Sequence, residues 1–219
     1  MGERGTETDD GYEQLRAAIL HGEFGAHARL IETELARRYG VGRAAIRTAL
    51  DRLEQDGIVE REPNRGARVR AISEAEAIET VEARAVLEGL AARYAARNAT
   101  DADIAALRVI VGEMAACLAA GDLLGISDGN ARLHSRLLAI ADNRTVARLI
   151  ERLHAQHVRS QFRVILVPGR PPQSVAEHRA IVEAVAARDP DAAEAAMRDH
   201  LAHTVEMLRL LAGSRAAGG

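Results

Sequence analysis

Several histidines in the later part of the sequence are spaced so that they could bind a metal ion. Asn130 and His134 are four residues apart, which places them on one face of a helix. His178 follows Glu177 near the start of an expected helix, and His200 lies on the last expected helix. Neutral imidazoles on facing helices of a bundle commonly bind zinc, nickel or similar ions. Histidines on half-buried helices more often only form hydrogen bonds or face solvent, so the residues alone leave both interpretations open.

A second group of residues has the spacing expected for DNA recognition. Arg43 and Arg47 are four residues apart, so they lie side by side on a helix. They point away from the apolar stripe of Ile46, Leu50 and Leu53. Such a pair can reach guanine edges or phosphates in a major groove.

The elements around this arginine pair predict a helix-turn-helix. Residues 35–39 form a short amphipathic helix, Gly40 ends it, and helical spacing resumes at Ile46. Two short helices around a glycine turn are typical of this motif. The apolar residues of 12–20 predict a further helix packed behind it.

A β-hairpin is expected directly after the second helix. Gly57 ends that helix, and residues 58–61 and 67–70 can form two strands. The turn chemistry between them comes from Pro63, Asn64 and Gly66, and the nearby basic residues are Arg65 and Arg68. This hairpin is interpreted as a wing, so residues 10–71 are expected to form a winged helix-turn-helix domain.

From Ser73 onward the pattern becomes helical throughout. The expected helices are residues 73–98, 101–120, 122–141, 145–167, 174–188 and 191–211. Pro168–Pro172 is interpreted as a loop. The fold class is therefore mainly α, with an antiparallel helical bundle over residues 72–212. Residues 1–9 and 213–219 are expected to be a disordered and a flexible tail.

Composition limits the classes of protein that need to be considered. The 219 residues suffice for two domains, and the formal net charge of -3 gives no overall indication of nucleic acid. All 29 basic residues are arginine, which we attribute mainly to codon bias, and aromatic residues are only 2%. The single Cys117 excludes an intramolecular disulfide. We find no signal peptide and no apolar run long enough for a membrane span, so a soluble cytoplasmic protein is expected.

These motifs resemble a known family of regulators. The segments YEQLRAAILHGEF, ELARRYGVGRAAIRTAL and RLEQDGIVEREPNRGARV look like the winged helix of the GntR superfamily of bacterial transcription regulators. The helical remainder is similar to the FCD ligand-binding domain of its FadR-like branch. The resemblance covers residues 10–212. It implies DNA contacts by Arg43 and Arg47, and Gly66 matches the family's wing glycine. Gly42 stands where the family usually has serine, and Thr33 where it often has a further arginine. Arg65 is a DNA-binding candidate from its expected place near the tip of the wing.

The resemblance also implies a metal site and an effector site. In metal-binding FCD domains the ligands match Asn130, His134, His178 and His200, although a carboxylate is commoner than the amide of Asn130. Arg84 matches an arginine that the family directs toward the cavity, while a salt bridge to Glu88 is the equally weighted alternative. The weaker effector candidates are Arg159 and Arg163. The helix that carries Arg84 could instead lie at a dimer interface.

We therefore expect a homodimeric, ligand-responsive transcription regulator that binds a palindromic double-stranded operator. A small organic acid would bind at a divalent metal, zinc, nickel or similar, and change DNA affinity. Two alternatives stay open. The chain could be a metal-dependent enzyme fused to a DNA-binding module, although no general base is evident and Glu177 is expected to point elsewhere. The metal itself could also be the signal.

Overall fold

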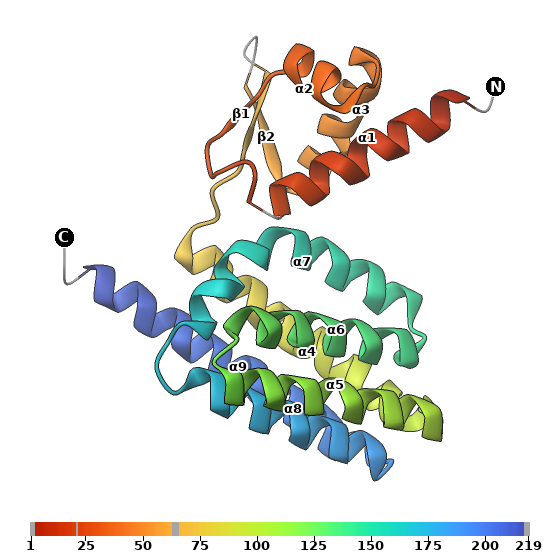
Figure 1. Ribbon diagram of the computed structural model, residues 1–219, viewed down its shortest axis with the longest axis vertical. Helices are drawn as coiled ribbons and strands as arrows, with labels where there is room; N and C mark the ends of the chain where they lie inside the picture. The colour runs from red at the N-terminus through yellow and green to blue at the C-terminus, as the bar shows by residue number, and fades with distance from the viewer. Residues whose placement is uncertain (1–2, 21, 63–65, 217–219) are drawn as a thin grey trace. The chain divides into compact units, whose positions relative to one another are not determined.

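The computed structural model describes residues 3–20, 22–62 and 66–216, with only the backbone given for residues 3–10, 20, 62, 154–163 and 214–216. The chain divides into two compact units, Met1–Ser73 and Glu74–Gly219, and each is described by itself (Figure 1). The division falls after Ser73, two residues beyond the boundary expected from the sequence.

The N-terminal unit is a winged helix, as expected. Its elements are α1 (Glu3–Leu20), β1 (Arg29–Leu30), α2 (Glu32–Tyr39), α3 (Arg43–Gln55), β2 (Val59–Glu62) and β3 (Gly66–Val69). The strands form an antiparallel sheet in the order β1-β3-β2, in which Glu62 pairs with Gly66 and Val59 with Val69. The core consists of aliphatic side chains from the helices and the sheet, among them Leu15, Ile19, Leu30, Ile46, Leu50 and Leu53.

Two features of this unit differ from the sequence-based expectation. Helix α1 begins at Glu3, so the expected disordered tail over residues 1–9 is wrong for its described part. Acidic residues are favourable at a helix N-terminus, and extending a helix that Tyr12 and Leu15 anchor in the core costs little. Strand β1 was not expected, because two residues are too short to show an alternating pattern.

Glycines set the geometry of the turn and of the wing. Gly40 ends α2 in the left-handed conformation, with φ of 67°, and its N–H bonds to the carbonyl of Ala36. Gly42 is the N-cap of α3 without a side-chain bond. Gly66 has φ of +85°, and a Cβ there would lie 3.2 Å from the carbonyl oxygen of Leu30. The positive φ and the close approach of the Leu30 carbonyl both favour glycine at position 66.

The second unit is a bundle of helices. They are α4 (Glu74–Asn98), α5 (Asp101–Ala120), α6 (Leu123–Ala141), α7 (Arg144–Ile165), α8 (Arg170–Ala186) and α9 (Pro190–Ala216). The first and last of these, α4 and α9, make the most extensive contact, and Figure 1 shows them lying along each other. Buried alanines of α4, such as Ala92 and Ala95, leave room for this close approach.

Local sequence explains how the bundle places its polar residues. Thr100 caps α5 in a capping box with Asp103. On α6, a Cβ at Gly129 would lie only 2.3 Å from Cγ of Met114, so glycine allows α6 to lie against α5. This contact fixes the helix that carries His134, about one turn further on.

The start of α8 corrects the sequence-based expectation. Residues 168–172 were expected to be a loop, but α8 begins at Arg170 and has proline in its first positions. Proline is tolerated there because the first N–H groups of a helix have no partner within it. The helix therefore begins four residues earlier than expected. Across the described residues, no helix is long and apolar enough to cross a membrane.

Candidate functional site

Three histidines from three helices meet inside the bundle. His134 comes from α6, His178 from α8 and His200 from α9, and each is buried. One nitrogen of each ring lies within 4.8 Å of the corresponding nitrogens of the other two. The Nε2 atoms of His134 and His178 are 3.3 Å apart. The structure thus brings together the three histidines that the sequence indicated.

The opposite nitrogen of each ring has a partner that orients the imidazole. Nδ1 of His134 contacts Oε2 of Glu88. Nδ1 of His200 lies 2.7 Å from Oε2 of Glu177, and Nδ1 of His178 lies 3.4 Å from the Ser174 hydroxyl. A carboxylate only accepts hydrogen bonds, so Nδ1 carries the proton in His134 and His200. In the neutral form of such a ring Nε2 is unprotonated, which is the arrangement typical of metal-binding histidines.

The environment keeps two of these rings neutral. Burial, with the nearby positive groups, holds the pKa of His178 and of His200 well below the ordinary histidine value. The lone pairs of His134 and His178 face each other at 3.3 Å unless a proton or a cation lies between them. Two nitrogens bound tetrahedrally to one zinc at about 2.0–2.1 Å lie about 3.3–3.4 Å apart. The donor set therefore fits a divalent metal.

Buried ion pairs enclose the histidines on one side. Nε of Arg84 donates to Oε1 of Glu88 at 2.7 Å, and both side chains are at most 5% exposed. The salt bridge between Arg84 and Glu88, which the sequence analysis gave as the alternative to a role at the cavity, is therefore present. Arg84 also lines the cavity beside His134. The salt bridge uses only Nε of Arg84 and Oε1 of Glu88. A role of Arg84 in the salt bridge and a role at the cavity are therefore compatible.

A second buried pair was missed by the sequence analysis. Nη1 of Arg170 donates to Oε2 of Glu177 at 2.7 Å, and Nη2 lies 3.3 Å from the hydroxyl of Thr204. Oε1 of Glu177 is 2.8 Å from Nδ1 of His203, at an ion-pair distance without the alignment of a hydrogen bond. Contrary to expectation, Glu177 points toward the histidines. Arg170 was overlooked because the surrounding prolines indicated a loop.

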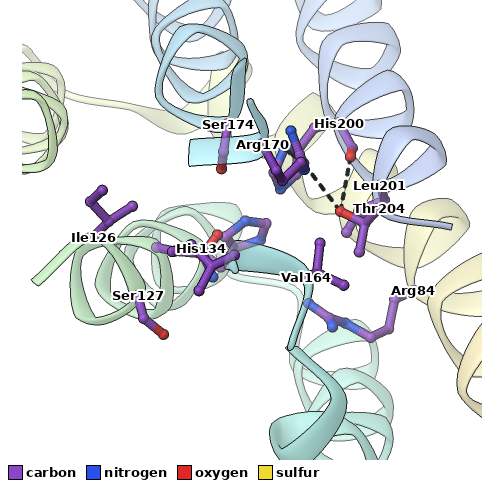
Figure 2. A pocket seen from close by; sticks show the side chains of 12 residues that line it. Arg84, Ile126, Ser127, His134, Val164, Arg170, Ser174, His200, Leu201 and Thr204 are labelled. Carbon is purple, nitrogen blue, oxygen red and sulfur yellow. Dashed lines mark hydrogen bonds between the residues drawn. The ribbon is translucent and has the colours of Figure 1, made fainter. Parts of the chain in front are cut away.

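A small cavity of about 50 Å³ lies next to the histidines, and Arg84, Arg170 and Thr204 are among the residues that line it. In Figure 2, Arg170 and His200 approach it from one side, His134 from the facing helix and Arg84 from a third side. Asn130 lines the same cavity, but no distance places it with the three histidines, so its role as a ligand stays a prediction. The side chains of Arg159 and Arg163 lie outside the described residues.

A larger cavity of about 400 Å³ adjoins His134 on the side of Glu88. Its walls come from α4, α6, α7 and α9 and are mostly apolar, with Leu137, Ile150 and Met197 among them. The bundle therefore has space near the histidines for the carbon skeleton of an organic molecule.

The arginines expected to contact DNA lie on the surface of the winged helix. Arg43 and Arg47 are both exposed on α3, and Thr33 is exposed on α2. Nε and Nη2 of Arg47 bond to the carboxylate of Glu32, a contact that the sequence analysis missed. Arg65 lies outside the described residues.

Comparison with protein families agrees with this division. Residues 8–69 match the model of bacterial regulatory proteins of the gntR family, and residues 79–203 match the FCD domain. Together these segments include both the exposed arginines and the three histidines.

Individual proteins resemble the chain over most of its length. It is 28% identical over 201 residues to the uncharacterized HTH-type transcriptional regulator YdhC of Bacillus subtilis (strain 168), covering 90% of this chain and 89% of that protein. It is 27% identical over 208 residues to the HTH-type transcriptional repressor GlaR of Escherichia coli (strain K12), covering 91% and 94%. The solved structure of E. coli McbR/YncC has a similar fold, with a TM-score of 0.79 at 19% identity over 94% of this chain and 98% of that one.

Proposed function

The chain belongs to the gntR family of bacterial regulatory proteins and carries an FCD domain, and on this premise we propose that it is a transcription regulator controlled by a small organic acid. The winged helix binds a palindromic operator as part of a homodimer, with Arg43 and Arg47 reading bases. The helical unit holds a divalent metal, zinc, nickel or similar, and the acid. Similarity to a repressor favours repression as the mode of action.

The observation that carries this proposal is the set of three buried histidines with oriented rings. Nε2 of His134, His178 and His200 would hold the metal, with Asn130 as a further candidate ligand. A bound divalent ion would supply positive charge and open coordination positions for oxygen atoms. The partners of the opposite ring nitrogens, Glu88 and Glu177, keep the imidazoles in place.

The charges around the cavity indicate the class of effector. Arg84 and Arg170 are balanced by Glu88 and Glu177, and all four side chains are at most 12% exposed. With neutral histidines, a divalent ion therefore adds uncompensated positive charge to a buried site. Uncompensated buried charge is costly, so an anion is favoured there. We infer a small mono- or dicarboxylate, whose oxygens can also meet the arginines.

Metal content tests the first part of this proposal. Purified full-length protein is expected to carry about one divalent ion per chain by elemental analysis and native mass spectrometry. His178→Ala should lose it, because one of three nitrogen ligands disappears. His203→Ala, on the same helix as His200, should keep it. Equal metal content in wild type and in a His178→Ala/His200→Ala variant would contradict the assignment.

A panel of sugar acids, hydroxy acids and dicarboxylates tests the second part. A true effector should raise the melting temperature of the metal-loaded protein and change its affinity for the operator, because binding to one state shifts the equilibrium. It should also be recovered chemically intact. If added metal alone changes operator affinity and no acid does, the metal is the signal.

A further inference from the structure

Arg47, the central exposed arginine of α3, is held by a carboxylate from another helix. Its Nη2 donates to Oε2 of Glu32 at 2.9 Å, and its Nε donates to Oε1 at 3.2 Å. Glu32 is the first residue of α2, on the other side of the glycine turn. This bidentate pair fixes the plane of the guanidinium, although the Arg47 side chain is 58% exposed.

Glu32 is itself fixed by the wing. Nη1 of Arg61, on β2, lies 3.3 Å from Oε1 of Glu32, and Nη2 of Arg61 donates to the carbonyl oxygen of Arg47 at 3.1 Å and also to Asp51. Only 15% of the Glu32 side chain is exposed. The hydrogen bonds from Arg47, then those from Arg61, lower the pKa of Glu32, so it stays ionised at neutral pH. One carboxylate thus joins α2, α3 and β2.

The geometry of a guanidinium determines what remains available on Arg47. The group has a side edge, formed by Nε and Nη2, and an end edge, formed by Nη1 and Nη2. Glu32 occupies the side edge. The end edge is left for a second bidentate partner, and O6 and N7 of guanine in the major groove are the base acceptors that suit it.

We propose that Glu32 is a positioning residue for base recognition, which holds Arg47 so that its end edge faces a guanine of the operator. This inference rests on the proposed DNA-reading role of α3. Arg43, exposed on the same helix, makes no ion pair with any described residue and therefore serves as an internal comparison.

Glu32 should favour specificity over affinity. A carboxylate close to DNA repels phosphates, so it weakens binding to every duplex. By fixing Arg47 it should also strengthen binding to the one base pair that the end edge fits. Specificity is a difference between affinities, so the uniform repulsion cancels, and the positioning of Arg47 is the effect that increases discrimination.

The test compares two charge-removing variants of the full-length protein. An operator is first selected from random duplexes with wild type, and fluorescence anisotropy then measures affinity for it and for a scrambled duplex. Glu32→Gln should reduce the ratio of operator to scrambled affinity about five- to tenfold, since one bidentate contact loses its support. Glu34→Gln removes the same charge from an exposed residue of α2 and should leave the ratio unchanged. Glu32→Asp keeps the charge but is one methylene shorter, so it should also reduce the ratio.

Replacing each operator guanine in turn by 7-deazaguanine, which lacks the N7 acceptor, locates the contact. At one guanine, the replacement should weaken operator binding by wild type. The same replacement should leave binding by Arg47→Ala unchanged, and it should weaken binding by Glu32→Gln less than binding by wild type. In the Arg47→Ala background, Glu32→Gln should no longer change discrimination. Circular dichroism checks that each variant is folded.

The possible failures can be told apart. If Arg47→Ala leaves discrimination intact, the proposed role of α3 is wrong. If Arg47→Ala reduces discrimination while Glu32→Gln and Glu32→Asp both match wild type, the positioning role of Glu32 is overturned. If Glu34→Gln reduces the ratio as much as Glu32→Gln, charge rather than geometry is responsible, and the inference is likewise overturned.

Discussion

The two units use arginine–glutamate pairs in opposite environments. In the winged helix, Arg47 pairs with Glu32 while 58% of the arginine side chain is exposed. In the helical bundle, Arg84 pairs with Glu88, and the two side chains are 3% and 5% exposed. The exposed pair leaves one edge of the Arg47 guanidinium open to solvent, which suits a surface that must accept DNA. A buried pair must stay balanced, because a buried charge without its partner is strongly destabilising.

The largest effect expected from this difference is on stability. Glu88→Ala should lower the free energy of unfolding of the helical unit in chelator-treated protein by about 3–5 kcal/mol, because Arg84 is left buried without a partner. Urea denaturation followed by circular dichroism measures it. Glu183→Ala removes one partner of the exposed Arg108–Glu183 pair and should not measurably shift the denaturation midpoint. Similar losses in the two variants would remove the distinction between buried and exposed pairs.

A smaller effect is expected at the DNA-binding surface. Arg43→Ala and Arg47→Ala should each weaken operator binding about 10- to 100-fold and relax specificity, because each arginine can make a bidentate base contact. Arg43→Ala should leave the unfolding midpoint unchanged, since its side chain is exposed. Arg47→Ala should lower it only slightly, because Arg61 still bonds to Glu32. Fluorescence anisotropy at fixed salt measures the affinity. Unchanged operator affinity in the double variant would show that α3 does not read the DNA.

Much of the fold could be predicted because its determinants are local. The helices follow from apolar spacing and from stops such as Gly40 and Gly121, and the structure has them close to the expected places. The histidines could be singled out by their positions on expected helices, and the resemblance to metal-binding FCD domains then implied that they act together as ligands. Arg170 was missed because its helix begins with proline, which in sequence resembles a loop.

Contacts between elements could not be predicted in the same way. The pairing of Glu32 with Arg47 depends on the angle between α2 and α3, which no periodicity encodes. Glu177 was expected to point away from the metal candidates, but α8 packs beside α9 so that its carboxylate reaches His200. The partners that orient a site are therefore harder to predict than the groups they orient.

The smallest expected effect concerns a hydrogen bond inside the winged helix. The hydroxyl of Tyr12 donates to Asp56 at 2.6 Å, and burial, then this bond, raises the pKa of Tyr12 from 10.0 to about 12. Tyr12→Phe should lower the free energy of unfolding by about 1 kcal/mol at neutral pH. Urea denaturation tests this.

The same residue predicts a pH dependence. The folded protein holds the Tyr12 proton more tightly than the unfolded chain, so its contribution to stability is complete below pH about 10 and is lost as pH rises toward 12. Absorbance at 295 nm should show a late tyrosine ionisation that is absent from Tyr12→Phe. If Tyr12→Phe and wild type show the same tyrosine titration between pH about 10 and 12, the assignment is contradicted.

The central claim is that the acid site and the DNA-binding surface are thermodynamically coupled. The most direct test measures the operator affinity of zinc-loaded full-length protein by anisotropy, without and with a saturating acid found by thermal shift. We expect a change of about 5- to 150-fold, a reciprocal change in acid affinity when operator is bound, and no response in His178→Ala. An acid that binds once per chain and leaves operator affinity unchanged would contradict it.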